Sequence, residues 1–216
     1  PFASTSLNDW VGRAAGLAIV QPFEWFRYFH LAHHRHTQDP ARDPELAGAP
    51  KPEDWAGFAW HLASLGYWRA KAAVLWGNAI GRIEADYLPA RIHPRLRREA
   101  RAMLALYAAA ALFTVAVSPV LLRVWLGPLV LGFPVLRLYL LAEHGRCPMV
   151  ADMLANTRTT FTNRLVRALA WNMPYHAEHH VLPQVPFHRL PALHDALRAH
   201  LRVTSPGYAA FTRDYV

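Results

Sequence analysis

Two long apolar runs separated by a single arginine most constrain how this chain can fold. Residues 102–122 (AMLALYAAAALFTVAVSPVLL) and 124–142 (VWLGPLVLGFPVLRLYLLA) lie on either side of Arg123. A helix rises about 1.5 Å per residue, so each run could cross a bilayer hydrocarbon core of roughly 30 Å. The pattern predicts a transmembrane hairpin over residues 102–142. A buried helical hairpin of a soluble protein is the alternative.

The arginines indicate how such a hairpin would be oriented. They are concentrated before it, in residues 91–101, and recur after it between residues 146 and 167. Cytoplasmic segments of membrane proteins carry such an excess, so we expect both ends of the hairpin at the cytoplasmic face. Arg137 interrupts the second run, and it should face protein or reach the membrane surface rather than meet lipid.

The composition narrows the class of protein further. A length of 216 residues suits a single domain over 1–216. We expect an all-α integral membrane helical bundle, with a helical cap at the cytoplasmic face. The net charge of +8 comes mostly from arginines beside apolar runs, which favours lipid headgroups over nucleic acid. Cys147 is the only cysteine, which excludes an internal disulfide and cysteine-ligated metal sites within the chain.

Other segments are less strongly patterned. Residues 55–76 are rich in tryptophan but are interrupted by charges, which predicts an interfacial helix. Residues 37–54 read as a loop from their Pro, Asp and Gly content. The apolar stretch within residues 7–29 is too short to span a membrane, and a short amphipathic helix is expected near 191–202.

One histidine pattern, H-x-x-H-H, occurs twice, at residues 30–34 and 176–180. On a helix, positions i, i+3 and i+4 share a face, so each copy would point three imidazoles the same way. Six imidazoles exceed the needs of one tetrahedral zinc, which favours two metal ions. A histidine-rich surface or a set of core histidines is the alternative. The candidate ligands from this pattern are His30, His33, His34, His176, His179 and His180.

Further residues could join or support such a site. His144 ends the second apolar run, where it is either a seventh ligand or an ordinary interfacial histidine. Asn172 is a candidate N-cap for the helix that carries the second copy, with Pro174 in its first turn. Side chains that could orient the imidazoles, or instead lie in solvent, are His36, Asp39, Asp43, Glu45 and Glu178. Glu143 is undecided, and we interpret His61, His93, His188, His194 and His200 as structural.

The metal is not fixed by the ligand type alone, because imidazole suits iron, zinc and copper. A site at a lipid face must act on an apolar substrate, whereas zinc typically activates water for hydrolysis. O₂ chemistry on an unactivated chain suits the setting better, which favours iron.

These residues resemble the membrane fatty acid desaturase family, whose superfamily includes lipid hydroxylases and carotenoid-oxygenating enzymes. The resemblance rests on the two H-x-x-H-H boxes, the intervening hairpin and the stretch NMPYHAEHHVLPQVPFHRLPALH (172–194), and it covers roughly residues 5–200. It implies histidine boxes at the cytoplasmic face that hold two non-haem irons. Residues 30–34 match the second box, residues 176–180 match the third, and His144 resembles an additional histidine of the superfamily.

The chain departs from the family pattern at its start. The first box, H-x-x-x-H, is absent, and PFASTSLNDWVG resembles the segment that follows it. We therefore expect a fragment that lacks the first box and the first membrane helices. Such a fragment would be inactive by itself, whereas the full-length protein would be active.

The resemblance implies O₂-dependent diiron desaturation of a fatty acyl chain in lipid metabolism. Electrons would come from a separate redox protein, because the chain has no flavin, nicotinamide or haem motif. A hydroxylase or ketolase acting on a fatty acid, sphingolipid or carotenoid is the first alternative. A non-enzymatic membrane metal-binding protein is the second, although Arg137 is the only ionisable residue within the apolar runs apart from Tyr107 and Tyr139. A zinc hydrolase is the third.

Overall fold

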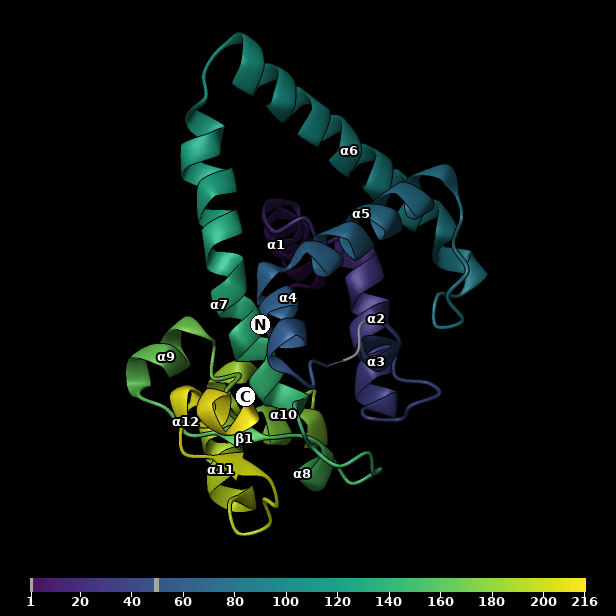
Figure 1. Ribbon diagram of the computed structural model, residues 1–216. Coiled ribbons are helices and arrows are strands. Elements are labelled where there is room, and N and C mark those ends of the chain that lie inside the picture. Colours follow the sequence, from purple (N-terminus) through teal and green to yellow (C-terminus); the bar gives the residue numbers. More distant parts are fainter. Residues whose placement is uncertain (1, 49–50) are drawn as a thin grey trace. The chain divides into compact units, whose positions relative to one another are not determined.

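Nearly every regular element of the chain is a helix (Figure 1). The computed structural model describes residues 2–48 and 51–216, so positions 49 and 50 of the predicted loop lie outside the described residues. The exception among the described residues is a two-stranded parallel sheet that pairs β1 (Thr159–Thr160) with β2 (Thr204–Ser205). The expected all-α class is confirmed.

The contacts of the chain divide it into two compact units. We call residues Phe2–Ala32 and Ser64–Pro134 the α5–α6 unit. We call residues His33–Ala63 and Val135–Val216 the histidine unit. Helices α2 (Phe23–His36) and α7 (Gly127–His144) are continuous through the boundary, so each contributes residues to both units.

The α5–α6 unit is built on the packing of α5 (Leu65–Ile80) against α6 (His93–Ala116), which converge in Figure 1. Small and flexible side chains, Ala79, Ala100 and Met103, let the two helices approach. Helix α1 (Thr5–Ala18) is capped by the Ser4 hydroxyl and is held to α6 by the Tyr107 hydroxyl, which donates to the Leu17 carbonyl at 2.8 Å.

Two stretches are long and apolar enough to cross a membrane, Ala90–Ala116 and Leu122–His144. The first comprises the 3-10 turn η1 (Ala90–Ile92) and α6, and the second comprises the π-helical turn η2 (Leu122–Leu126) and α7. Only 11% of each apolar window is buried, and apolar side chains such as Leu112 (68% exposed) and Leu131 (78%) face outward. The core hairpin of a soluble protein would hide such faces, which counts against that alternative. The transmembrane hairpin itself stays a prediction.

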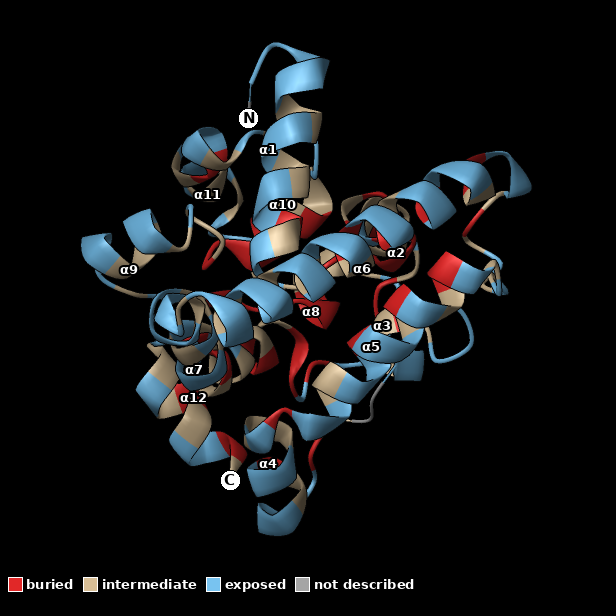
Figure 2. Ribbon diagram, turned by 90° about the horizontal axis from the view of Figure 1, so that it is seen from above, coloured by how far each residue is buried: buried red, intermediate tan, exposed pale blue. Residues whose placement is uncertain are grey.

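The histidine unit gathers short elements around the C-terminal half of α7. Its hydrophobic core is formed by Phe58, Leu141, Ala142, Phe211 and Tyr215. The longest buried stretches of this unit are residues 155–160, from the end of α8 into β1, and 174–178, at the start of α10, and Figure 2 shows buried colour on both helices. The remaining elements are α3 (Pro44–Gly48), α4 (Trp55–Ala63), α8 (Met153–Asn156), α9 (Arg164–Leu169), α10 (His176–Val181), η3 (Phe187–Arg189), α11 (Leu190–Leu197) and α12 (Tyr208–Tyr215).

Several boundaries differ from those expected. The predicted helix over 55–76 is two helices, because Ser64 takes a left-handed conformation (φ 60°) between α4 and α5. Asn172 is also left-handed (φ 59°) and is not an N-cap, because α10 begins only at His176. The Asn172 amide instead donates to the carbonyl of Phe187 at 3.2 Å.

Candidate metal centre

Helix α2 places His33 and His34 at the edge of the histidine unit, and both side chains are buried. Their helix ends at His36, where the chain turns through the left-handed residue Gln38 (φ 62°). This turn lets Asp43 fold back, so that its Oδ2 accepts from the backbone N–H of Gln38 at 2.8 Å. The loop after the histidine box at residues 30–34 therefore closes onto the box itself.

Four Nε2 atoms from three separate segments meet in the interior of the histidine unit. The Nε2 of His144 lies 3.2 Å from the Nε2 of His33 and 3.2 Å from that of His176. The Nε2 of His176 lies 3.2 Å from that of His180 in turn. All four side chains are buried. We call His33, His144, His176 and His180 the inner cluster.

The other ring nitrogen of three of these residues has a partner that fixes the tautomer. His33 Nδ1 lies 2.9 Å from the Asp43 carboxylate, and His144 Nδ1 lies 3.3 Å from the backbone carbonyl of Asn156. The Thr37 hydroxyl donates to the His33 carbonyl, so it must accept from His180 Nδ1 at 3.1 Å. Each Nδ1 therefore carries the hydrogen, and each neutral ring directs an Nε2 lone pair into the cluster.

Converging lone pairs repel one another unless a proton or a cation lies between them. With metal–imidazole bonds of about 2.1 Å, neighbouring ligand nitrogens lie about 3.0 Å apart at octahedral angles and about 3.4 Å apart at tetrahedral angles. The observed Nε2 separations of 3.2 Å fall between these values. The nitrogens of His33, His144 and His180 also lie within 4.8 Å of one another, so the donor set fits a metal ion.

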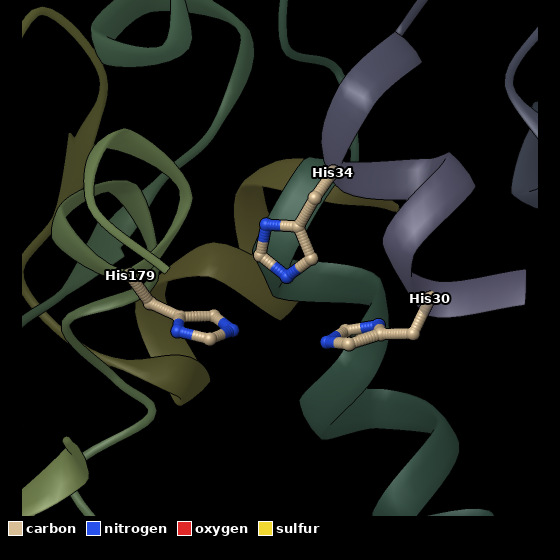
Figure 3. Close-up of side chains that lie close together, drawn as sticks. All are labelled: His30, His34 and His179. Carbon is tan, nitrogen blue, oxygen red and sulfur yellow. The ribbon is translucent and has the colours of Figure 1, made fainter. Parts of the chain in front are cut away.

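A second pair of imidazoles lies beside the inner cluster. The rings of His34 and His179 meet edge to face with centroids 4.6 Å apart, and the His34 ring stacks on that of His180 at 4.1 Å. Their ring nitrogens lie within 4.8 Å of each other. Figure 3 shows His34 and His179 pointing toward one another. His30 lies one turn before His34 on α2, partly buried, with its ring stacked on Phe26 at 5.2 Å.

The electrostatic environment keeps most of these rings neutral. Burial holds the pKa of His176 and of His180 well below the ordinary value, and neighbouring imidazoles act in the same direction. Burial, together with the charge of His33, lowers the pKa of His179 to about 4. For His33, burial opposes protonation, but the Asp43 and Glu45 carboxylates outweigh it and raise the pKa. A neutral imidazole is the form that binds metal.

The other residues considered from the sequence fall in different places. The Asp39 carboxylate accepts from Arg42 Nε at 2.7 Å and from the Ala41 amide at 2.9 Å, within its own loop. Glu45 Oε2 lies 3.5 Å from His33 Nε2, at the edge of the inner cluster. Partly buried His36 ends α2.

Glu178 is fully buried, which excludes the alternative that it lies in solvent. Its partners are Thr159 and His194, not the box histidines.

Sequence reasoning missed two residues that support the inner cluster and left a third undecided. Thr37 follows His33 by one turn and bonds His180, and Asn156 offers its backbone carbonyl to His144. Glu143 was undecided from the sequence, and its Oε1 lies 3.4 Å from His176 Nδ1. Its position directly before His144 was the only available signal. Neither a backbone carbonyl nor a threonine has a sequence signature.

A family model described as fatty acid desaturase matches residues 2–212. The match therefore includes both histidine boxes, His144 and the two candidate spans. This chain belongs to the fatty acid desaturase family. Its apolar helices and the family together make this desaturase-family chain a membrane protein with an oxidoreductase-type function. No curated protein matches it.

Proposed function

We propose that this chain forms part of an O₂-dependent desaturase whose histidines hold two iron ions. The observation that carries the proposal is the convergence of the Nε2 atoms of His33, His144 and His180, with each opposite ring nitrogen already hydrogen-bonded. The inner cluster would hold one iron. His34 and His179 would hold the other, and His30, which shares a face of α2 with His34, stays a predicted ligand.

Bound iron would supply the oxidising power for removing two hydrogens from an unactivated acyl methylene pair with O₂ as co-substrate. The residues of this chain would supply position and a water-poor surrounding. Asp43, Thr37 and the Asn156 carbonyl hold the ring orientations, and buried side chains around them exclude water. Precise placement of the acyl chain would then decide which carbons react.

The membrane setting supports a lipid or acyl substrate. The exposed apolar faces of Ala90–Ala116 and Leu122–His144 suit contact with bilayer lipid, and His144 stands at the end of the second stretch. The arginine distribution favours the cytoplasmic face for the histidine unit. We therefore expect the acyl chain to reach the metal centre from the bilayer.

A separate electron-transfer protein completes the proposal, and a cleft of about 230 Å³ offers it a docking place. The cleft is lined by Arg35, Arg42 and Met149, and also by Thr37 and Gln38. Thr37 bonds His180, and the side-chain amide of Gln38 donates to the His144 carbonyl at 2.9 Å. Two residues that line the cleft are therefore hydrogen-bonded to residues of the inner cluster. Asp39 also lines the cleft and pairs with Arg42, so the charge of Arg35 is the feature that favours an acidic redox protein. Replacing Arg35 by Glu should raise the KM for the donor and weaken its salt dependence, whereas an unchanged KM would exclude this docking place.

Metal analysis and product analysis of the full-length protein test the proposal. Two irons per chain are expected, and His33→Ala and His179→Ala should each lose iron and activity together. His93→Ala is the matched control, because the Nε2 of His93 bonds the Leu88 carbonyl at 3.0 Å and His93 is in neither histidine box. Full iron content in both ligand variants would exclude the assignment.

The product separates the reactions that the same ligands could support. Mass spectrometry of the lipid product should show the loss of two hydrogens. The gain of one oxygen would instead identify a hydroxylase or ketolase. A centre that binds zinc and hydrolyses a substrate would contradict both.

A further inference from the structure

The short helix that carries the third box needs an external support. Helix α10 has only six residues, His176–Val181, and its N-cap residue Tyr175 makes no side-chain capping bond. Helices of this length are not stable alone, because nucleation costs more than so few hydrogen bonds return. Its orientation must therefore be fixed by contacts on the side that faces away from the inner cluster.

Glu178 occupies that side. It follows His176 by two residues, which places it about 200° around the helix axis from that ring. Its side chain is fully buried, and both carboxylate oxygens accept hydrogen bonds. Oε2 accepts from the Thr159 hydroxyl at 2.5 Å, and Oε1 accepts from His194 Nδ1 at 2.5 Å. One carboxylate thus ties α10 to β1 and to α11.

His194 is itself held from two directions. Its ring stacks on Tyr175 with centroids 4.6 Å apart, and it meets the edge of Phe161 at 5.8 Å. Tyr175 directly precedes His176, and its hydroxyl accepts from the Arg167 guanidinium. We call Glu178, Thr159, His194 and Tyr175 the α10 support. Tyr175 directly precedes His176 and Glu178 directly precedes His179, and the hydrogen bonds of Glu178 go to Thr159 and His194 rather than to a ring of the inner cluster.

We propose that Glu178 and His194 act as a pair of positioning residues that set the rotation of α10 about its axis. This inference rests on the proposed metal-binding function. The rotation decides whether the Nε2 atoms of His176 and His180 stay 3.2 Å apart and directed into the cluster. Without the Glu178 anchor, α10 would fray or turn, and two ligands would leave their positions together.

Metal release measures this role without requiring turnover. The full-length protein would be loaded with Co²⁺ or Fe²⁺ and mixed with excess chelator, and the rate of metal loss would be followed. Glu178→Gln leaves only one acceptor oxygen for two donors, and His194→Leu removes the donor. Each should speed release about tenfold, at the low end of the affinity loss seen when a ligand loses its own hydrogen-bond partner, because Glu178 acts on the ligands through α10 and not on a ring.

Rescue and coupling distinguish positioning from general stability. His194→Asn restores an N–H donor near the place of Nδ1, so release should return to within about threefold of wild type. The double variant Glu178→Gln/His194→Leu should release metal no faster than Glu178→Gln alone, because both changes remove one interaction. The visible spectrum of bound Co²⁺ should change in the two single variants that break the pair and recover in His194→Asn.

Phe211→Leu is the control for destabilisation, because Phe211 belongs to the core of the same unit and is not part of the α10 support. It should lower the thermal midpoint with wild-type release. Equal acceleration in Phe211→Leu, or unchanged release in Glu178→Gln, would overturn the inference. If the wild-type protein binds no metal, the result contradicts the proposed metal-binding function and, with it, the positioning role. If wild type binds metal and His180→Ala does not, the Glu178 result tests the positioning role alone.

Discussion

Asp43 accepts a hydrogen bond from His33, with Oδ1 and Nδ1 2.9 Å apart and both side chains almost fully buried. The carboxylate keeps the hydrogen of the neutral His33 ring on Nδ1. The Nε2 that faces His144 therefore carries a lone pair. A contact between residues ten apart in the sequence thus sets the protonation of a nitrogen that lies against a ring from another helix.

Replacing Asp43 by Asn should weaken metal binding. The amide can present N–H to the ring, which favours the opposite tautomer and turns the His33 lone pair away from the cluster. We expect the dissociation constant for Fe²⁺ to rise about 10- to 100-fold, measured by competition with a chelator. Asp39→Asn is the matched control from the same loop, because Asp39 bonds Arg42 and Ala41 only within that loop. Equal loss in both variants would contradict the orienting role.

Replacing Thr37 by Val should affect the metal through His180. The hydroxyl donates to the His33 carbonyl at 2.7 Å and accepts from His180 Nδ1 at 3.1 Å, and valine can do neither. We expect metal affinity to fall about tenfold. Thr212→Val removes a like bond to a carbonyl four residues back, Tyr208, but contacts no imidazole. That variant should bind metal as wild type does, and a similar loss there would refute this role for Thr37.

The stability of the histidine unit should fall as the pH decreases from about 6.5 to 4. Burial and the charge of Arg137 lower the pKa of His61 to about 4, and Arg137 donates to His61 Nδ1 at 2.8 Å. The unfolded chain takes up a proton near pH 6.5, so stability is full above that pH and is lost toward the folded-state pKa. The measurement is thermal unfolding of wild type and His61→Gln across this range. Parallel curves for the two proteins would exclude a contribution from His61.

A charge introduced on the exposed face of α6 should impair membrane insertion. Leu112 is 68% exposed within a candidate span, so Leu112→Lys would place an ammonium against lipid. Insertion scales give about 2.5–3.5 kcal/mol for lysine at a helix centre. We expect the variant protein to become extractable by alkaline carbonate, whereas Ala192→Lys at an exposed position of α11 should stay in the membrane fraction. Tight membrane association of both variants would argue against a spanning α6.

The sequence also anticipated the environment of Arg137, which was expected to face protein or reach the surface. Its guanidinium bonds His61, and the His61 Nε2 lies 3.3 Å from the Arg137 carbonyl. The sequence interprets His61 as structural, and its two contacts with Arg137 agree with that interpretation. The same sequence could not reveal that Glu178 and His194 meet, because residues sixteen apart carry no periodic signal once a turn and an irregular segment separate their helices.

By itself, the sequence determined the helical class, the two apolar stretches and the histidines that share a helix face, because period and composition are local properties of the chain. It did not determine the kink at Ser64, the late start of α10 at His176, or the partners of the ring nitrogens. Only the tertiary structure decided that Asp43, Thr37 and a backbone carbonyl accept hydrogen bonds from the Nδ1 atoms of histidines on three different segments. A hydrogen bond depends on the position of two groups in space, and no spacing along the chain fixes that position when the backbone between them turns freely.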